Sequence, residues 1–234
     1  DAGRSMEAVK TAITYRYEED ACNRVIYSES HDEVANGKAR VPQEINNDDP
    51  TGWHAQKRST LAAGLLFTSP GIPMIFQGQE FLQGEWFRDN VPLDWHMNEE
   101  YHGVARMYRD LIWLRLNRDG VSRGLCGQNV AVTHVNDQQN LIAFQRWDQH
   151  GDGDDVMVIA NCGYEVKEGY RIGMPQSGEW KLRFNSDASI YSDDFQNTLS
   201  THLMATDDAL DGLPASAEVT IAPYSVLIYS RDPS

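Results

Sequence analysis

Apolar and polar positions follow two different patterns along this chain, and the change falls near residue 117. Up to that point, stretches of helical periodicity alternate with short apolar runs. The spacing predicts helices over residues 5–17, 53–68 and 98–117, and buried strands over 25–28 and 73–76. Because helices and strands alternate with these lengths, we expect parallel βα units. Two such units cannot close a (β/α)8 barrel, so residues 1–119 are predicted to be the C-terminal part of one.

After residue 117 the apolar runs become short, rich in β-forming residues and separated by turns. This pattern is typical of an antiparallel β sandwich of ~100 residues. The predicted strands include residues 130–135, 141–147, 156–160, 180–184 and 219–229. We therefore expect an α/β region followed by an all-β sandwich domain over residues 120–234.

The most informative motif is the apolar run 25–34, which ends in the pair His31-Asp32. In barrels of parallel strands, the carboxyl ends of the strands carry the chemistry. An Asp at that edge can accept hydrogen bonds from two vicinal hydroxyls, and the adjacent His can donate to the same sugar ring. Ser30 and Glu33, which flank the pair, are candidate substrate-binding residues. The alternative interpretation is that Asp32 only caps a turn after the strand.

A second polar cluster follows the second predicted strand and contains Gln79, Glu80 and Trp86. An exposed Trp beside carboxylates and amides suits a carbohydrate cleft, where apolar ring faces stack on sugars and carboxylates bind hydroxyls. These three residues are therefore candidate substrate-binding residues. Alternatively, Glu80 forms a cap or an ion pair at the barrel mouth, and Trp86 is a core residue.

Composition excludes several classes of protein. Hydrophobic residues make up 41% of the 234 positions and charged residues 24%, as in an average globular protein. The net charge of −15 repels nucleic acid and anionic membranes, and no apolar window is long enough to span a bilayer. Neither the histidines nor the cysteines have metal-ligand spacing, so we expect no metal and no cofactor.

The three cysteines, Cys22, Cys126 and Cys162, are predicted to be reduced thiols. That favours a cytoplasmic location, or the plastid stroma in a plant-like source. The chain has no initiator Met. We therefore expect it to begin inside a longer protein or after processing.

Taken together, these motifs resemble the α-amylase superfamily of glycoside hydrolases. Ser30-His31-Asp32-Glu33 after an apolar strand resembles the fourth signature region of that superfamily, and residues 71–80 resemble its eighth barrel strand. Residues 222–229 are similar to the last strand of its all-β C-terminal domain. Within the superfamily, residues 78–81, 85–86 and 93–95 are most similar to 1,4-α-glucan branching enzymes.

The resemblance implies that Asp32 is the third carboxylate, which stabilises the transition state, and that His31 binds hydroxyls of the reacting glucose. The family's nucleophilic Asp and acid/base Glu lie on the fourth and fifth strands, which this chain does not contain. Retaining double displacement requires both groups, ~5 Å apart. The resemblance therefore implies a parent enzyme that acts on glycogen, starch or amylose. The remainder of its barrel would be the partner of this chain, which would be inactive alone.

Two alternatives stay open. In the first, the parent protein is an α-amylase-type hydrolase or a trehalose-forming relative, which belongs to the same superfamily but forms a different product. A non-catalytic glucan-binding or assembly module, supplied by the β sandwich, would be a protein of another class.

Overall fold

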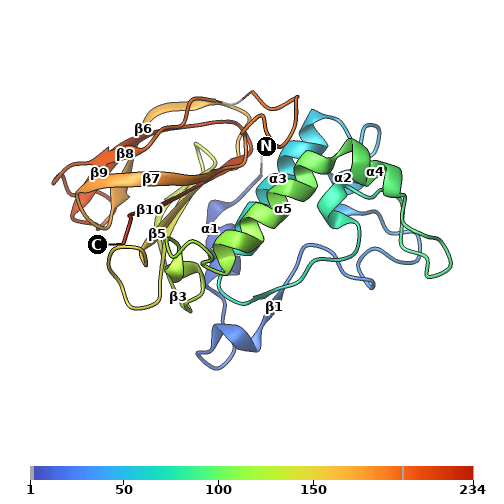
Figure 1. Ribbon diagram of the computed structural model, residues 1–234, viewed down its shortest axis with the longest axis horizontal. Coiled ribbons are helices and arrows are strands. Elements are labelled where there is room, and N and C mark those ends of the chain that lie inside the picture. The colour runs from blue at the N-terminus through green and yellow to red at the C-terminus, as the bar shows by residue number, and fades with distance from the viewer. Residues whose placement is uncertain (1–2, 197, 234) are drawn as a thin grey trace.

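A layer of helices lies against one face of an antiparallel sheet (Figure 1). The computed structural model describes residues 3–196 and 198–233. The helices are α1 (Met6–Thr14), α2 (Val41–Ile45), α3 (Trp53–Thr68), α4 (Trp95–Glu100) and α5 (His102–Arg115). Short 3-10 turns lie at Ala21–Asn23, Gln79–Phe81 and Arg123–Leu125.

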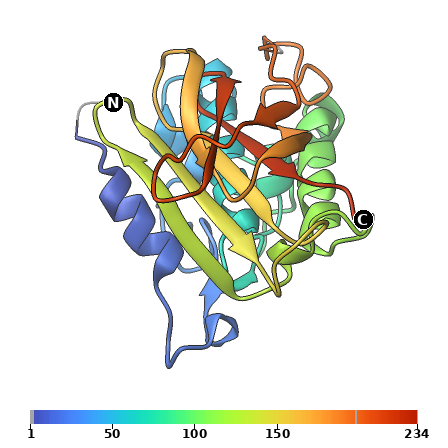
Figure 2. The same cartoon turned by 90° about the vertical axis from the view of Figure 1, so that its left-hand side faces the viewer.

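The all-β part confirms the predicted antiparallel architecture. One sheet has the strand order β3-β4-β5-β10-β7-β8, and β6 pairs with β9 in a second sheet that lies across it (Figure 2). The strands are β3 (Asn129–Asn136), β4 (Leu141–Trp147), β5 (Val156–Asn161), β6 (Lys167–Met174), β7 (Gly178–Asn185), β8 (Leu203–Ala205), β9 (Ala215–Ile221) and β10 (Ser225–Ser230). The sequence pattern missed β6, which carries Lys, Glu and Arg, and β8, which is only three residues long.

Successive residues of the larger sheet face two different cores, as the period of two along a strand requires. On β4, Ile142 and Phe144 pack with the helices, whereas Leu141 and Ala143 face the β6–β9 sheet. The first of these cores also contains Met107 of α5. Residues on both sides of the predicted boundary at 119 therefore share one hydrophobic core.

One parallel strand pair is present in the first half of the chain. β1 (Val25–Ile26) and β2 (Ile72–Pro73) lie side by side, with Val25 opposite Ile72, and α2 and α3 connect them along the sequence. Both strands are shorter than predicted. A two-stranded sheet is not a barrel, so within residues 3–196 and 198–233 the predicted barrel tail is seen only as this parallel pair.

The predicted helix over residues 98–117 is in fact two helices. Tyr101 separates α4 from α5 with φ −102° and ψ 32°, outside the helical region. Gly103 then allows a close approach, because a Cβ at this position would lie 2.2 Å from the carbonyl oxygen of Tyr191. The kink is therefore fixed by a contact with a segment 88 residues away, which local periodicity does not report.

Arginine side chains hold the end of α3 and the start of β2 in place. Arg115 donates to the carbonyl oxygens of Phe67, Ser69 and Gly71 at 3.2, 2.6 and 2.5 Å. The buried Arg146 donates to the carbonyl of Thr68. The last carbonyls of a helix have no partner inside the helix and carry partial negative charge, so cations there are favourable. These contacts hold the connection between α3 and β2 in place.

Candidate active-site edge

His31 and Asp32 lie in a turn after β1, and both side chains reach solvent. Their side chains are 70% and 83% exposed, and His31 Nε2 lies 3.3 Å from Asp32 Oδ1. No backbone amide among the described residues donates to the Asp32 carboxylate, so it does not cap the turn. A ligand with vicinal hydroxyls could reach both groups.

Ser30 stabilises that turn. Its hydroxyl accepts a hydrogen bond from the Glu33 amide at 3.3 Å, and its carbonyl accepts one from Val34 at 3.1 Å. Ser30 is buried, whereas Glu33 is exposed. Of these two predicted substrate-binding residues, only Glu33 has a side chain open to a ligand.

Gln79 connects the ends of the two parallel strands. Its side-chain amide donates to the hydroxyl of Ser28 at 2.5 Å, and its amide oxygen accepts from the Phe76 backbone at 3.2 Å. Gln79 is buried. Sequence reasoning placed this side chain in a glucan cleft, but its amide group is engaged within the protein.

Trp86 keeps part of its ring at the surface, with 39% of the residue exposed. The guanidinium carbon of Arg88 lies 5.0 Å from the ring centroid, a cation–π distance. The loop that carries Trp86 runs beside the turn after β1, since the Phe87 amide donates to the Val34 carbonyl at 2.6 Å. The fold therefore brings the two predicted clusters to one edge.

A buried ion pair beneath this edge was missed by sequence reasoning. Arg40 Nη1 lies 3.1 Å from Glu29 Oε2, and the two side chains are 2% and 1% exposed. Glu29 also accepts a hydrogen bond from the Val41 amide, and Arg40 donates to the carbonyls of Gln77 and Glu85. Arg40 sits in a polar loop with no local signal that would mark it as buried.

Burial dominates the electrostatics of this cluster. Loss of solvent raises the pKa of Glu29, although Arg40 and the Val41 amide oppose that shift. Burial likewise lowers the pKa of Arg40. It raises the pKa of Tyr108 on α5, and the nearby Glu29 and Glu80 add to that effect. The half-buried Glu80 therefore lies among the buried titratable side chains around the strand ends.

The described residues contain no group of three or more His, Cys, Asp or Glu arranged to hold a metal ion. Within the same ranges, none of the helices is long and apolar enough to cross a bilayer. At this edge, the exposed side chains of His31 and Asp32 are available to form hydrogen bonds with hydroxyl groups of a ligand. Retaining hydrolysis or transfer would need two further carboxyl groups at a fixed separation.

Comparison with known proteins defines the class. Residues 132–232 match the family described as alpha amylase, C-terminal all-beta domain. The fold is similar to a pullulanase from Anoxybacillus sp. LM18-11 solved with maltotetraose, with a TM-score of 0.65 and 18% identity over 96% of this chain and 30% of that one. A pullulanase type I from Bacillus subtilis str. 168 solved with maltose gives the same TM-score over 97% and 31%. These likenesses show a shared fold.

Proteins of similar sequence identify the family more closely than the fold does. The chain is 33% identical to the 1,4-alpha-glucan branching enzyme GlgB of Shewanella sp. (strain W3-18-1) over 224 residues, or 93% of this chain. It is also 33% identical to GlgB 1 of Xanthomonas euvesicatoria pv. vesicatoria (strain 85-10) over 184 residues, or 77% of this chain. The chain belongs to the α-amylase superfamily and is similar to part of its branching enzymes. It spans 28% and 24% of the length of these two relatives.

Proposed function

We propose that this chain is the C-terminal section of a branching-enzyme-like protein that acts on α-glucans. The observation that carries the proposal is the open His31–Asp32 pair after β1, in a chain 33% identical to branching enzymes over 93% of its length. In the complete protein, Asp32 would stabilise the electron-poor anomeric carbon, and His31 would donate to hydroxyls of the same glucose. A solvent-exposed carboxylate contributes little packing, which leaves it free for this role.

The parent protein would cleave an α-1,4 linkage and pass the glycosyl group to a glucan 6-hydroxyl. The first step forms a bond between an enzyme carboxylate and the anomeric carbon while a second carboxyl group protonates the leaving oxygen. The second step transfers the sugar to the acceptor hydroxyl, whose proton goes to that same second group. Both carboxyl groups belong to the preceding section of the protein, so residues 1–234 alone are expected to be inactive.

A chimera tests this proposal. Residues 1–234 replace the matching segment of the Shewanella sp. (strain W3-18-1) enzyme, and the product is incubated with amylose. Branching lowers the iodine colour without releasing reducing ends, whereas an α-amylase-type hydrolase releases them. We expect Asp32→Asn to reduce turnover at least ~10³-fold with an unchanged melting temperature.

The matched control is Asp207→Asn, because Asp207 is exposed in the β8–β9 connection. That variant should retain full activity. Equal activity of the Asp32→Asn and Asp207→Asn chimeras would refute the assignment of Asp32. The chimera could also lack turnover while residues 120–234 still migrate more slowly in a native gel that contains glycogen. That result would favour the alternative in which this chain is a glucan-binding module.

A further inference from the structure

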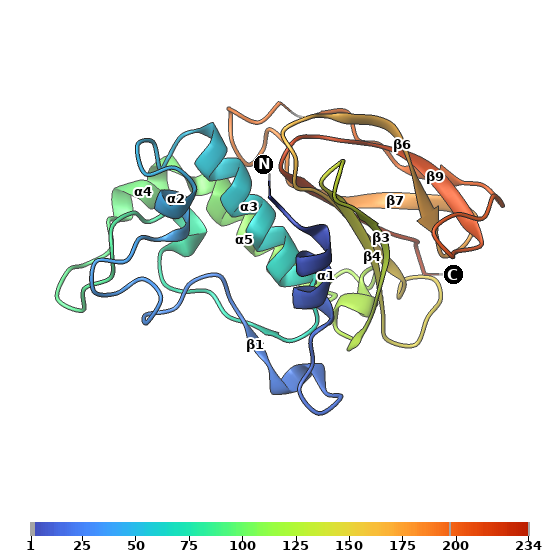
Figure 3. The same cartoon turned by 180° about the vertical axis from the view of Figure 1, so that it is seen from behind.

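Arg40 is buried beneath the candidate active-site edge and contacts three segments of the chain. Its side chain is 2% exposed. Nη1 donates to Glu29 Oε2 at 3.1 Å and to the Gln77 carbonyl at 3.0 Å, and Nε donates to the Glu85 carbonyl at 3.2 Å. One guanidinium therefore joins the chain after β1, the chain after β2 and the loop that carries Trp86. Figure 3 shows α2, which begins directly after Arg40, at the opposite end of the molecule from β6 and β9.

Two aromatic rings extend this contact to the turn that contains the His–Asp pair. The guanidinium carbon of Arg40 lies 5.1 Å from the ring centroid of Phe76. The rings of Phe76 and Phe87 meet edge to face with centroids 5.2 Å apart. The Phe87 amide donates to the Val34 carbonyl at 2.6 Å, at the end of the turn. Arg40 is therefore connected to this turn from two sides, since Glu29 precedes the turn and Val34 closes it.

The candidate glucan-binding side chains that stay open lie on loops, so their positions depend on the contacts beneath them. The side chains of His31 and Asp32 are 70% and 83% exposed, and Trp86 is 39% exposed. Loops are more mobile than the elements they connect. A displacement of about 1 Å can cost roughly 10²-fold in rate, even when its cause lies away from the reacting atoms. A buried contact that fixes both loops would therefore affect the chemistry.

We propose that Arg40 is a positioning residue of the branching-enzyme-like protein, which holds the His–Asp pair and the Trp86 loop in one arrangement at the strand ends. Glu29 orients the guanidinium with one carboxylate oxygen and accepts the Val41 amide at 2.8 Å with the other. A planar guanidinium suits this role, because its fork of donors can reach several acceptors at once. A side chain so deeply buried does not touch a glucan, so Arg40 acts through the loops that it contacts. The inference rests on the proposed function.

The first test measures branching kinetics in the chimera with the Shewanella enzyme. Arg40→Met should lower kcat at least about 10²-fold and change KM for amylose much less, since it misplaces groups that act in the transition state. The control is Lys57→Met, which breaks a buried ion pair with Asp187, away from this edge. Measured below the melting temperature of every variant, the control should keep the kcat of the unsubstituted chimera. Equal losses of kcat in the two variants would overturn the inference.

A double variant separates positioning from general stability. Glu29→Gln with Arg40→Met leaves neither member of the pair as a buried charge without its counter-ion, so the melting temperature should recover most of the loss caused by Arg40→Met. The contacts with the Gln77 and Glu85 carbonyls stay absent, so kcat should remain low. Recovery of kcat together with the melting temperature would reduce Arg40 to a structural role. The double variant also carries the test if Arg40→Met by itself does not fold.

Amide hydrogen exchange tests the same contacts without any activity. In isolated residues 1–234, the Phe87 amide that donates to Val34 should exchange at least about tenfold faster in the double variant, because the loop opens more easily. Amides that pair β4 with β5 should keep their rates. An unchanged rate at Phe87 would overturn the inference. A chimera without turnover would instead count against the proposed function, and the rate at Phe87 would still show whether Arg40 holds the loop.

Discussion

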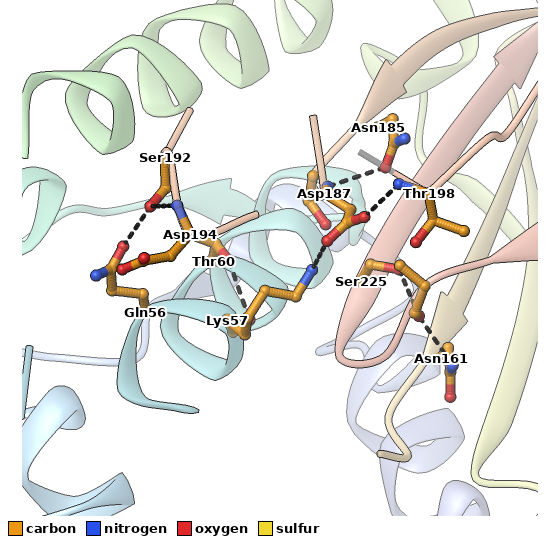
Figure 4. A network of polar contacts seen from close by, with 12 residues as sticks. Gln56, Lys57, Thr60, Asn161, Asn185, Asp187, Ser192, Asp194, Thr198 and Ser225 are labelled. Carbon is orange, nitrogen blue, oxygen red and sulfur yellow. Dashed lines mark hydrogen bonds and ion pairs between the residues drawn. The ribbon is translucent and has the colours of Figure 1, made fainter. Parts of the chain in front are cut away.

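The ammonium group of Lys57 lies 2.6 Å from Oδ1 of Asp187, and the two side chains are 0% and 2% exposed (Figure 4). Lys57 belongs to α3, and Asp187 follows β7 on the other side of the core. Asp187 Oδ2 also accepts a hydrogen bond from the Thr198 amide at 2.8 Å. The pair therefore joins the helical layer to the β7–β8 connection, 130 residues apart in sequence.

Removal of one member of this pair should be costly. We expect Lys57→Met to lower the free energy of unfolding by about 3–5 kcal/mol, because Asp187 would remain as a buried charge without its counter-ion. Urea denaturation of residues 1–234 measures the change. The control is Lys10→Met, since Lys10 pairs with Glu7 at the surface and should change stability by less than about 1 kcal/mol. Lys57→Met with Asp187→Asn should recover part of the loss, and equal effects of the two Lys variants would contradict the prediction.

The close contact at Gly103 predicts a backbone-specific defect. A Cβ there would lie 2.2 Å from the Tyr191 carbonyl oxygen, so Gly103→Ala should separate α5 from the β7–β8 connection. We expect a loss of about 1–3 kcal/mol in urea denaturation. At Gly84 a Cβ would meet nothing within 4 Å, so Gly84→Ala should be neutral or stabilising by up to about 1 kcal/mol. A larger loss of stability in Gly84→Ala than in Gly103→Ala would show that the contact between Gly103 and Tyr191 does not hold α5 in place.

Glu29 should make the stability depend on pH. Burial raises its pKa in the folded chain above the ordinary value of 4.5, so the folded state binds more protons than the unfolded state just above that pH. The contribution of Glu29 to stability is therefore present below pH 4.5 and is lost as the pH rises through the folded-state pKa. Urea midpoints measured from pH 4 to pH 8 should show this fall, and Glu29→Gln should remove it. An unchanged pH profile in the variant would exclude Glu29 as the source.

The thiols should differ in their reactivity towards iodoacetamide. Cys162 is buried, and burial raises its pKa to about 11, so little thiolate exists at pH 8. Cys22 and Cys126 are exposed. Mass spectrometry of the folded chain should find Cys162 unmodified and Cys22 alkylated, whereas in urea all three should react. Alkylation of Cys162 at the rate of Cys22 would show that the α1 side of the core opens readily.

The sequence was most informative where structure depends on near neighbours. Short continuous apolar runs predicted β4 and β5, because both faces of each strand pack against a core. The single strand predicted over residues 219–229 is wrong, since this stretch contains the end of β9 and most of β10, separated at residues 222–224. The strand lengths and the break at Tyr101 were not predictable, since contacts with distant segments set them. β6 was also missed, because its exposed face carries charged residues that hide the alternation.

At the candidate site, the motif around His31 and Asp32 was found from local sequence, and the structure leaves both side chains open. Ser30 and Gln79 belonged to the same motifs, yet their polar groups form hydrogen bonds within the fold. A motif gives the order of residues and not the direction of each side chain. That direction depends on which neighbours compete for each polar group.

Order along the chain therefore determined the class of β domain and the position of the His–Asp pair. Tertiary structure alone decided the pairing of Glu29 with Arg40 and of Lys57 with Asp187. It also buried Glu80 Oε2, which accepts no hydrogen bond from the part of the chain that the structure describes. The reason is that burial is a property of the whole packed chain. The sequence does not distinguish a charged residue that is surrounded by water from one that is paired with a counter-ion. Only the packed fold removes the water.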